Sequence, residues 1–199
     1  MNLESYRALF LVLTIGLALA IASPAIAEIL PQRNPELFSE LWLLGPDHKA
    51  EGYPFNVSAG EDYGVFVGVG NQMTETEYYM VYVKLCNTTD PSLDVNASIP
   101  SSCEPLYEYK SFIGSGKTWE TYVTFRFEDV VVAGDVLSVG NFVINDTTFP
   151  IGVSTTWNSD GKGFIFELSF ELWLYDVVND SFQFDDRFVS LFLNMTNSN

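Results

Sequence analysis

Residues 114–118 (GSGKT) resemble the end of a phosphate-binding loop. Such a loop needs a glycine five residues before its second glycine, and then a helix whose N-terminal N–H groups bind phosphate. This chain has Ser111 where that glycine belongs, and an alternating apolar run at 118–127 follows. We therefore predict a hairpin turn here and no nucleotide site.

Residues 158–161 (NSDG) resemble a fragment of a calcium-binding loop, which supplies oxygen ligands at alternating positions and closes with a bidentate glutamate. Asn158 and Asp160 supply two such oxygens, but Ser169 occupies the closing position. Because Asp-Gly between two strands is first a hairpin signal, we predict a turn rather than a metal site.

The remaining titratable candidates are an acidic group and one histidine. Asp176, Asp180, Asp185 and Asp186 form the acidic end of the last predicted hairpin. Paired carboxylates about 5–9 Å apart bind cations or do acid–base chemistry, whereas charges at a strand edge discourage aggregation; we favour the edge. His48, the only histidine, has no Ser or Cys nucleophile motif nearby. We expect no catalytic, cofactor-binding or metal-binding residue, and no enzyme.

Aromatic residues make up 15% of the chain, and they are the strongest candidates for binding. The four tryptophans could line a sugar-binding or partner-binding face, although half-buried strands also favour aromatics. They are Trp42, Trp119, Trp157 and Trp173. Trp173 and Tyr175 are predicted to lie on the outward face of a strand, where an exposed patch would mark a contact surface.

The elements that must position these residues are predicted to be strands. In residues 164–174 (FIFELSFELWL) apolar side chains occupy every second position, which is typical of a long half-buried strand. Further strands are predicted at 38–44, 63–70, 77–86, 106–112, 118–127, 136–144 and 187–194. This pattern predicts an all-β antiparallel sandwich.

Glycines are dense in one of these strands. Residues 63–70 (YGVFVGVG) place valines on one face and Gly64, Gly68 and Gly70 on the other, with Phe66 among them. Glycine at this density in a strand predicts close approach by a neighbouring backbone or an aromatic ring.

The N-terminus contains an uncharged apolar run from Ala8 to Ala27, directly after Arg7. About 20 such residues span a bilayer as a helix, which favours an uncleaved anchor. Alternatively, Ala25-Ile26-Ala27 is a signal-peptidase site, with Pro24 breaking the helix before it. Both alternatives place residues 28–199 outside the cytoplasm. We predict an anchor or signal peptide at 1–27, a stalk at 28–37 and one extracytoplasmic domain at 38–196.

Cysteine and asparagine usage agree with export. The two cysteines, Cys86 and Cys103, predict one disulfide, which would stabilise the fold by about 3 kcal/mol. Six N-x-S/T sequons predict N-glycosylation, although polar turns in an exported chain would give the same pattern. The sequons are at Asn56, Asn87, Asn96, Asn145, Asn179 and Asn194.

The charge of the chain excludes two classes of protein. Its 26 acidic and 9 basic residues give a net charge of −17, which repels nucleic acid. With 47% hydrophobic residues, it is also too apolar for an intrinsically disordered chain. We expect repulsion between such outward-facing chains to keep a dense envelope layer soluble.

The run from residue 40, ELWLLGPDHKAEGYPFNVSAGEDYGVFVGVGN, and the following EYYMVYVKL resemble the DUF1616 family of uncharacterised, mainly archaeal membrane proteins. The C-terminal RFVSLFLNMT is similar to the family's closing strand, so the resemblance spans about 38–195. This chain reads Asn71-Gln72-Met73 where the family has Asn-His-Glu, so any site using that histidine is absent. The resemblance implies an outward-facing immunoglobulin-like sandwich.

Together these patterns predict a membrane-anchored extracellular envelope protein with a structural or adhesive role and no cofactor. Its partners would be the membrane, through the N-terminal helix, and other envelope or membrane proteins. The alternative is an accessory module of a membrane complex that binds carbohydrate or peptide.

Overall fold

The computed structural model of this protein describes residues 3–29, 37–87 and 99–195. The chain divides into two units, Met1–Glu36 and Leu37–Asn199, and each is described by itself.

The described residues of the first unit form one helix, α1 (Leu3–Ile29). The helix continues through position 24, so the predicted break at Pro24 is wrong. A proline removes one backbone hydrogen bond from a helix, and the helical residues on both sides tolerate this loss. Its described apolar side chains are exposed, from 52% at Ile15 to 72% at Ile21. A search restricted to the described residues identifies no helix with the length and apolarity of a membrane span.

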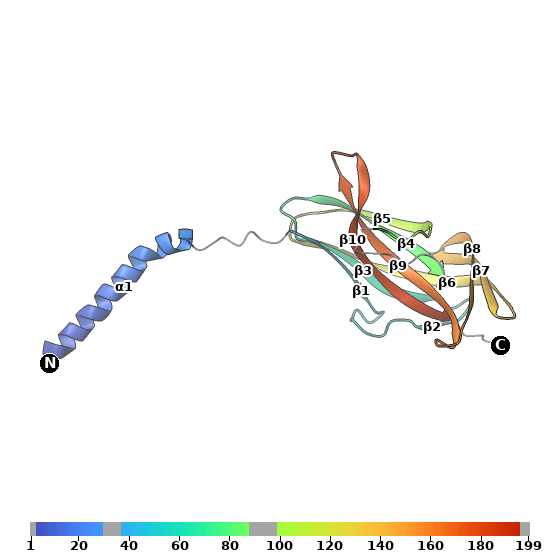
Figure 1. The fold of residues 1–199 in the computed structure, drawn as a ribbon, viewed down its shortest axis with the longest axis horizontal. Helices are drawn as coiled ribbons and strands as arrows, with labels where there is room; N and C mark the ends of the chain where they lie inside the picture. Colours follow the sequence, from blue (N-terminus) through green and yellow to red (C-terminus); the bar gives the residue numbers. More distant parts are fainter. Residues whose placement is uncertain (1–2, 30–36, 88–98, 196–199) are drawn as a thin grey trace. The chain divides into compact units, whose positions relative to one another are not determined.

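The second unit consists of β-strands, which confirms the predicted all-β fold (Figure 1). The strands are β1 (Ser39–Leu44), β2 (Asn56–Val57), β3 (Tyr63–Asn71), β4 (Glu77–Asn87), β5 (Pro105–Ile113), β6 (Lys117–Ala133), β7 (Val136–Ile144), β8 (Thr147–Asn158), β9 (Gly163–Asp176) and β10 (Ser181–Met195). The specifically immunoglobulin-like character stays a prediction.

These strands form two sheets that meet at the β8–β9 hairpin. Sheet A has the order β1-β3-β6-β7-β8, and all its pairs are antiparallel. Sheet B has the order β5-β4-β9-β10-β2, and only the short β10–β2 pair is parallel. β1 begins at one end of the unit and β10 finishes at the opposite end (Figure 1).

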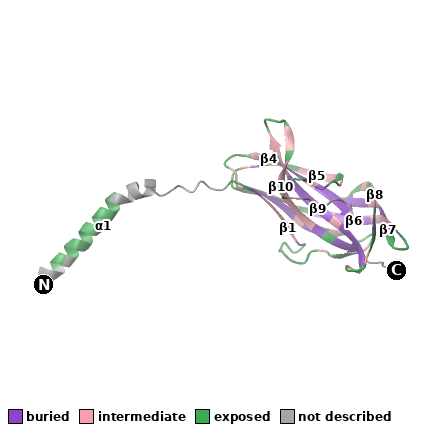
Figure 2. Ribbon diagram, in the orientation of Figure 1, coloured by how far each residue is buried: buried purple, intermediate pink, exposed green. Residues whose placement is uncertain are grey.

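The core lies between the inner faces of the two sheets (Figure 2). Phe166, Leu168 and Phe170 of β9 are fully buried there, as the alternation in residues 164–174 predicts. Phe127 of β6 contacts Phe166 across the sheets, with ring centroids 5.5 Å apart. Burial of these large side chains supplies most of the driving force for folding.

Four elements differ from the sequence prediction. The short β2 was not predicted, and β10 begins at Ser181, six residues before its predicted start at 187. β8 was not predicted, because Pro150 and Gly152 interrupt its pattern; prolines are tolerated in edge strands, and β8 is such a strand. β6 continues six residues beyond the predicted end at 127, because these residues pair with β7, and the register is kept across the left-handed residue Asp129 (φ 53°).

Candidate functional site

An aromatic surface covers the outward side of sheet B. Four adjacent strands contribute to it, because β4 and β9 direct alternate residues away from the core and β10 continues beside β9. We call this surface the aromatic face and define it as Tyr78, Tyr82, Phe112, Trp173, Tyr175, Phe182 and Phe184. The predicted outward position of Trp173 and Tyr175 agrees with this placement.

The rings of the aromatic face contact one another in two groups. Tyr78 stacks on Phe112 with centroids 4.1 Å apart, and it also contacts Phe182 at 5.1 Å. Further along, Trp173 contacts Tyr82 at 5.4 Å and Phe184 at 5.8 Å. Such pairs hold the rings in fixed positions, which preorganises the surface for a flat or apolar ligand.

The edge of this face is both apolar and charged. Phe112 on β5 is 72% exposed, although its ring stacks on Tyr78. The neighbouring Lys110 forms an ion pair with Glu108 at 2.6 Å and lies 5.8 Å from the ring of Phe182. A strongly exposed phenylalanine beside charged groups is typical of a contact surface.

A buried ion pair lies below the outer surface of the same sheet. The Nζ atom of Lys84 is 2.8 Å from Oε2 of Glu171, and the two side chains are 4% and 0% exposed. The hydroxyl of Ser101 donates to Glu171 Oε1 at 2.6 Å and its backbone N–H donates at 2.9 Å. Lys84 in turn donates to the carbonyl of Ser101 at 2.9 Å. Both charges are therefore compensated, as buried charges must be.

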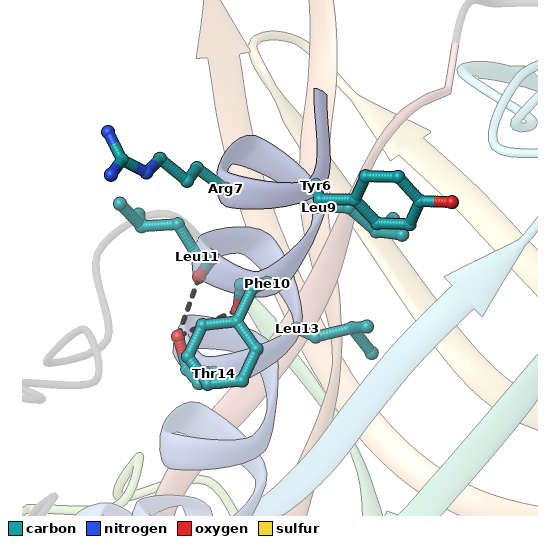
Figure 3. Close-up of a pocket in the computed structure, with 7 residues that line it drawn as sticks. All are labelled: Tyr6, Arg7, Leu9, Phe10, Leu11, Leu13 and Thr14. Atoms are coloured by element: carbon teal, nitrogen blue, oxygen red, sulfur yellow. Dashed lines mark hydrogen bonds between the residues drawn. The ribbon is translucent and has the colours of Figure 1, made fainter. Parts of the chain in front are cut away.

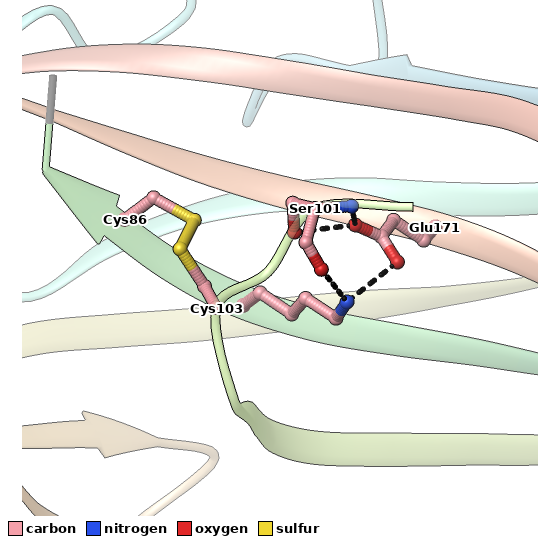
Figure 4. The surroundings of a disulfide bond; sticks show 5 residues. Cys86, Ser101, Cys103 and Glu171 are labelled. Carbon is pink, nitrogen blue, oxygen red and sulfur yellow. Dashed lines mark hydrogen bonds and ion pairs between the residues drawn. A yellow bond between two sulfur atoms is a disulfide. The ribbon is translucent and has the colours of Figure 1, made fainter. Parts of the chain in front are cut away.

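The disulfide holds this arrangement closed. Cys86 bonds to Cys103, as predicted from the sequence, and this ties the end of β4 to the segment that contains Ser101 (Figure 4). Since Ser101 covers Glu171 from the outer side of the sheet, the bond keeps the ion pair away from solvent. The ion pair and the disulfide hold the outer side of sheet B in place, and the charges of Lys84 and Glu171 compensate each other.

The tryptophans do not form one common face. Trp42 lies on the outward side of sheet A, where its Nε1 donates to Glu120 at 3.0 Å. Its ring packs over Gly68, because a Cβ atom there would lie 2.2 Å from the Trp42 ring. Tyr122 covers Gly64 in the same way. The predicted close approach of aromatic rings is thus confirmed at Gly64 and Gly68, whereas the side chain of Glu40 lies against Gly70.

His48 contacts the same side of sheet A. Its Nε2 lies 2.5 Å from Glu120 Oε1, and its side chain is 57% exposed. Burial alone would raise the pKa of Glu120, but the hydrogen bonds from His48 and Trp42 outweigh it and hold the pKa below its usual range. The histidine therefore fixes a turn to the sheet, and it lies at the surface.

Both motif-like segments are turns. Lys117 donates its N–H to the carbonyl of Gly114 at 3.0 Å, which closes a turn with Gly116 at φ 65°. This turn joins β5 of sheet B to β6 of sheet A, and the two strands do not pair with each other. In the β8–β9 hairpin, Asn158 Oδ1 accepts the N–H of Gly161 at 2.7 Å. The hairpin predicted at 158–161 is confirmed. At 114–118 the predicted turn is present, but the predicted hairpin is wrong, because the turn connects the two sheets.

The four aspartates lie in two separate places. Asp176 and Asp180 flank the tip of the β9–β10 hairpin, and hydrogen bonds from the N–H of Val178 and from Asn179 lower the pKa of Asp176. Asp185 and Asp186 form a bulge farther along β10, where burial raises the pKa of Asp185. Across the described residues, no three His, Cys, Asp or Glu side chains gather closely enough to hold a metal ion.

The sequons differ in accessibility. Asn56 and Asn179 are exposed, and Asn87 is half-buried at the end of β4. Asn145 is also half-buried; its Oδ1 accepts the N–H of Thr124 and its Nδ2 donates to Tyr109. Asn194 is only 4% exposed. The sixth sequon, Asn96, lies outside the described residues, and glycosylation stays a prediction at all six.

Hollows lie along α1 and beside β5. The larger, about 770 Å³, is lined only by side chains of α1 between Tyr6 and Thr14 (Figure 3), so one helix surface forms it without an opposing wall. The second, about 440 Å³, lies beside β5 and is lined by Tyr82, residues 105–108 and Phe149. The second hollow adjoins the aromatic face through Tyr82.

Comparison with known protein families gives one match. A family model described as a domain of unknown function, DUF1616, matches residues 31–132, which is half of the chain. The match includes β1 to β6 almost to its end, whereas the similarity noted in the C-terminal strand lies outside it. No curated protein matches the chain.

Solved structures give distant similarities. A β-glucosidase from Listeria innocua in complex with gluconolactone has 10% identity and a TM-score of 0.38, and the match covers 81% of this chain and 16% of that chain. The same enzyme in complex with glucose has 12% identity and a TM-score of 0.37, with the same coverage. The chain thus corresponds to about one sixth of those enzymes.

Proposed function

This chain belongs to the DUF1616 family, and on that premise we propose that it is an extracellular envelope protein that binds other envelope or membrane proteins and catalyses no reaction. The aromatic face is the observation that carries this proposal. Its rings are held by one another, and Phe112 at its edge is 72% exposed. Enrichment of aromatics in a preorganised patch is typical of protein contact surfaces.

Two further observations support a location outside the cytoplasm. A disulfide between Cys86 and Cys103 is typical of oxidising compartments. We also propose that α1 anchors the protein, since the run Ala8–Ala27 is uncharged and the described apolar side chains of α1 are exposed. Removal of this run by signal peptidase would instead give a secreted protein.

The contact role is tested by photo-crosslinking. A benzophenone amino acid replaces Phe182 on the aromatic face, and a matched variant carries it at Tyr122, which is 43% exposed on the outward side of sheet A. We expect discrete protein adducts in intact envelopes from the Phe182 variant alone. Equal adducts from both positions, or none from Phe182, would contradict an aromatic contact surface.

The location is tested by intact-mass analysis of protein from a glycosylating archaeal host. The mass shows whether Met1 to Ala27 persists, how many sequons are occupied and whether the thiols are oxidised. Free thiols together with unmodified sequons would overturn the proposed location.

Carbohydrate binding by an accessory module is the second candidate. The hollow of about 440 Å³ beside Tyr82 and the half-buried ring of Trp173 favour it, because aromatic rings stack on sugar rings. Migration of the protein in gels containing polysaccharide, compared with that of a Trp173→Ala variant, tests it. Retardation of the wild type alone would support this candidate over protein contact.

A further inference from the structure

The strand β5 presents an unpaired edge. Among the described strands, β5 pairs only with β4, so the N–H and C=O groups along its other edge have no strand partner. The other edges are less open: β2 is only two residues long, Pro150 removes a donor from β8, and the hydroxyl of Tyr53 donates to the carbonyl of Leu43 on β1 at 2.8 Å. An open edge is a template for pairing with another chain.

The sequence of β5 is self-complementary in charge. Glu108 and Lys110 flank Tyr109, and both are exposed on the outward side of sheet B. When two such strands pair antiparallel about a two-fold axis at Tyr109, each Glu108 lies opposite Lys110 of the other copy. Opposite charges in this cross-strand position stabilise a sheet, and like charges destabilise it.

The same register also pairs apolar surfaces. It brings Phe112 of each copy to Leu106 of the other, because these residues are equally distant from Tyr109 in sequence, and Leu106 lies at the register shift between β4 and β5. Leu106 lines the hollow of about 440 Å³ beside β5. Phe112 is 72% exposed, so it is available to enter this hollow. By symmetry the contact forms twice.

From these two matches we propose that the protein forms a homodimer in which residues 106–112 of β5 pair antiparallel with the same residues of a second copy. The dimer joins the two B sheets into one continuous sheet and brings two aromatic faces side by side. Of the aromatic face it uses only Phe112, at the edge of the sheet, so the other rings of that face stay available to another partner.

The test is a charge exchange in the full chain, followed by light scattering and sedimentation in a mild detergent. Glu108→Lys places like charges opposite each other at both ends of the contact, so we expect the dimer to weaken by roughly tenfold or more. The double variant Glu108→Lys/Lys110→Glu restores opposite charges and should restore the dimer. Lys110→Glu alone should behave like Glu108→Lys.

A second pair of variants tests the apolar contact. Phe112→Ser should weaken the dimer, whereas Phe192→Ser, which changes a 55% exposed residue on β10, should leave it intact. Circular dichroism and thermal melting verify that each variant is folded. A monomeric wild type, a dimer that persists in every variant, or a double exchange no better than Glu108→Lys would each overturn the proposal.

Discussion

Replacing Lys84 by methionine tests the buried ion pair directly. Glu171 is fully buried and Lys84 is 4% exposed, so water cannot replace the missing ammonium group. Removing one partner of a buried pair costs about 3–5 kcal/mol. Because Ser101 still donates two hydrogen bonds to Glu171, we expect the lower end, about 3 kcal/mol in the free energy of unfolding at neutral pH. Urea unfolding of the full chain at neutral pH, for the wild type and the variant, measures this loss.

Two controls separate this cause from general damage. Lys49→Met removes an exposed pair with Glu51, at 3.6 Å, and should change stability by less than about 0.5 kcal/mol. The double variant Lys84→Met/Glu171→Gln keeps an acceptor for Ser101 without the charge, so it should regain most of the loss. A loss below about 1 kcal/mol at neutral pH would refute the reasoning.

Two more predictions follow from packing. Gly68→Ala should lower the free energy of unfolding by about 1–3 kcal/mol, because the new Cβ would lie 2.2 Å from the ring of Trp42. Gly114→Ala is the control: the nearest atom to its new Cβ is 3.5 Å away, so its melting temperature should stay near that of the wild type. Equal losses of melting temperature in the two variants would contradict this account. In protein from a glycosylating host, glycopeptide mass spectrometry should find Asn179 modified and Asn194 unmodified, since Asn194 is 4% exposed. A glycan on Asn194 of the folded protein would be incompatible with the packing of β10.

Local patterns predicted most of the strands and turns. The period-two alternation in β9 and the Gly114 and Asp160-Gly161 turns depend on neighbouring residues, so the sequence alone located them. The dense glycines of β3 predicted close aromatic contacts, although the sequence did not show that Trp42 and Tyr122 supply the rings.

Long-range burial could not be predicted in the same way. Lys84 and Glu171 occupy outward positions in their strands, and by alternation alone both would face solvent. They are buried because the segment with Ser101 folds over them, 70 residues away from Glu171 in sequence. The two cysteines predicted that a disulfide joins this segment to β4. Nothing in the sequence around Lys84 or Glu171 indicated that the joined segment would bury these two side chains.

The placement of the first and last strands has a mechanical consequence. β1 starts at one end of the folded unit and β10 finishes at the other (Figure 1). A force that pulls on these two ends therefore acts along the strands, and the six residue pairs that join β1 to β3, from Ser39–Asn71 to Leu44–Phe66, share it in shear. Strands sheared in this way must break their hydrogen bonds together, whereas strands peeled from one end break them singly. A chain pulled at its N-terminal end would thus resist stretching with all the hydrogen bonds between β1 and β3 at once.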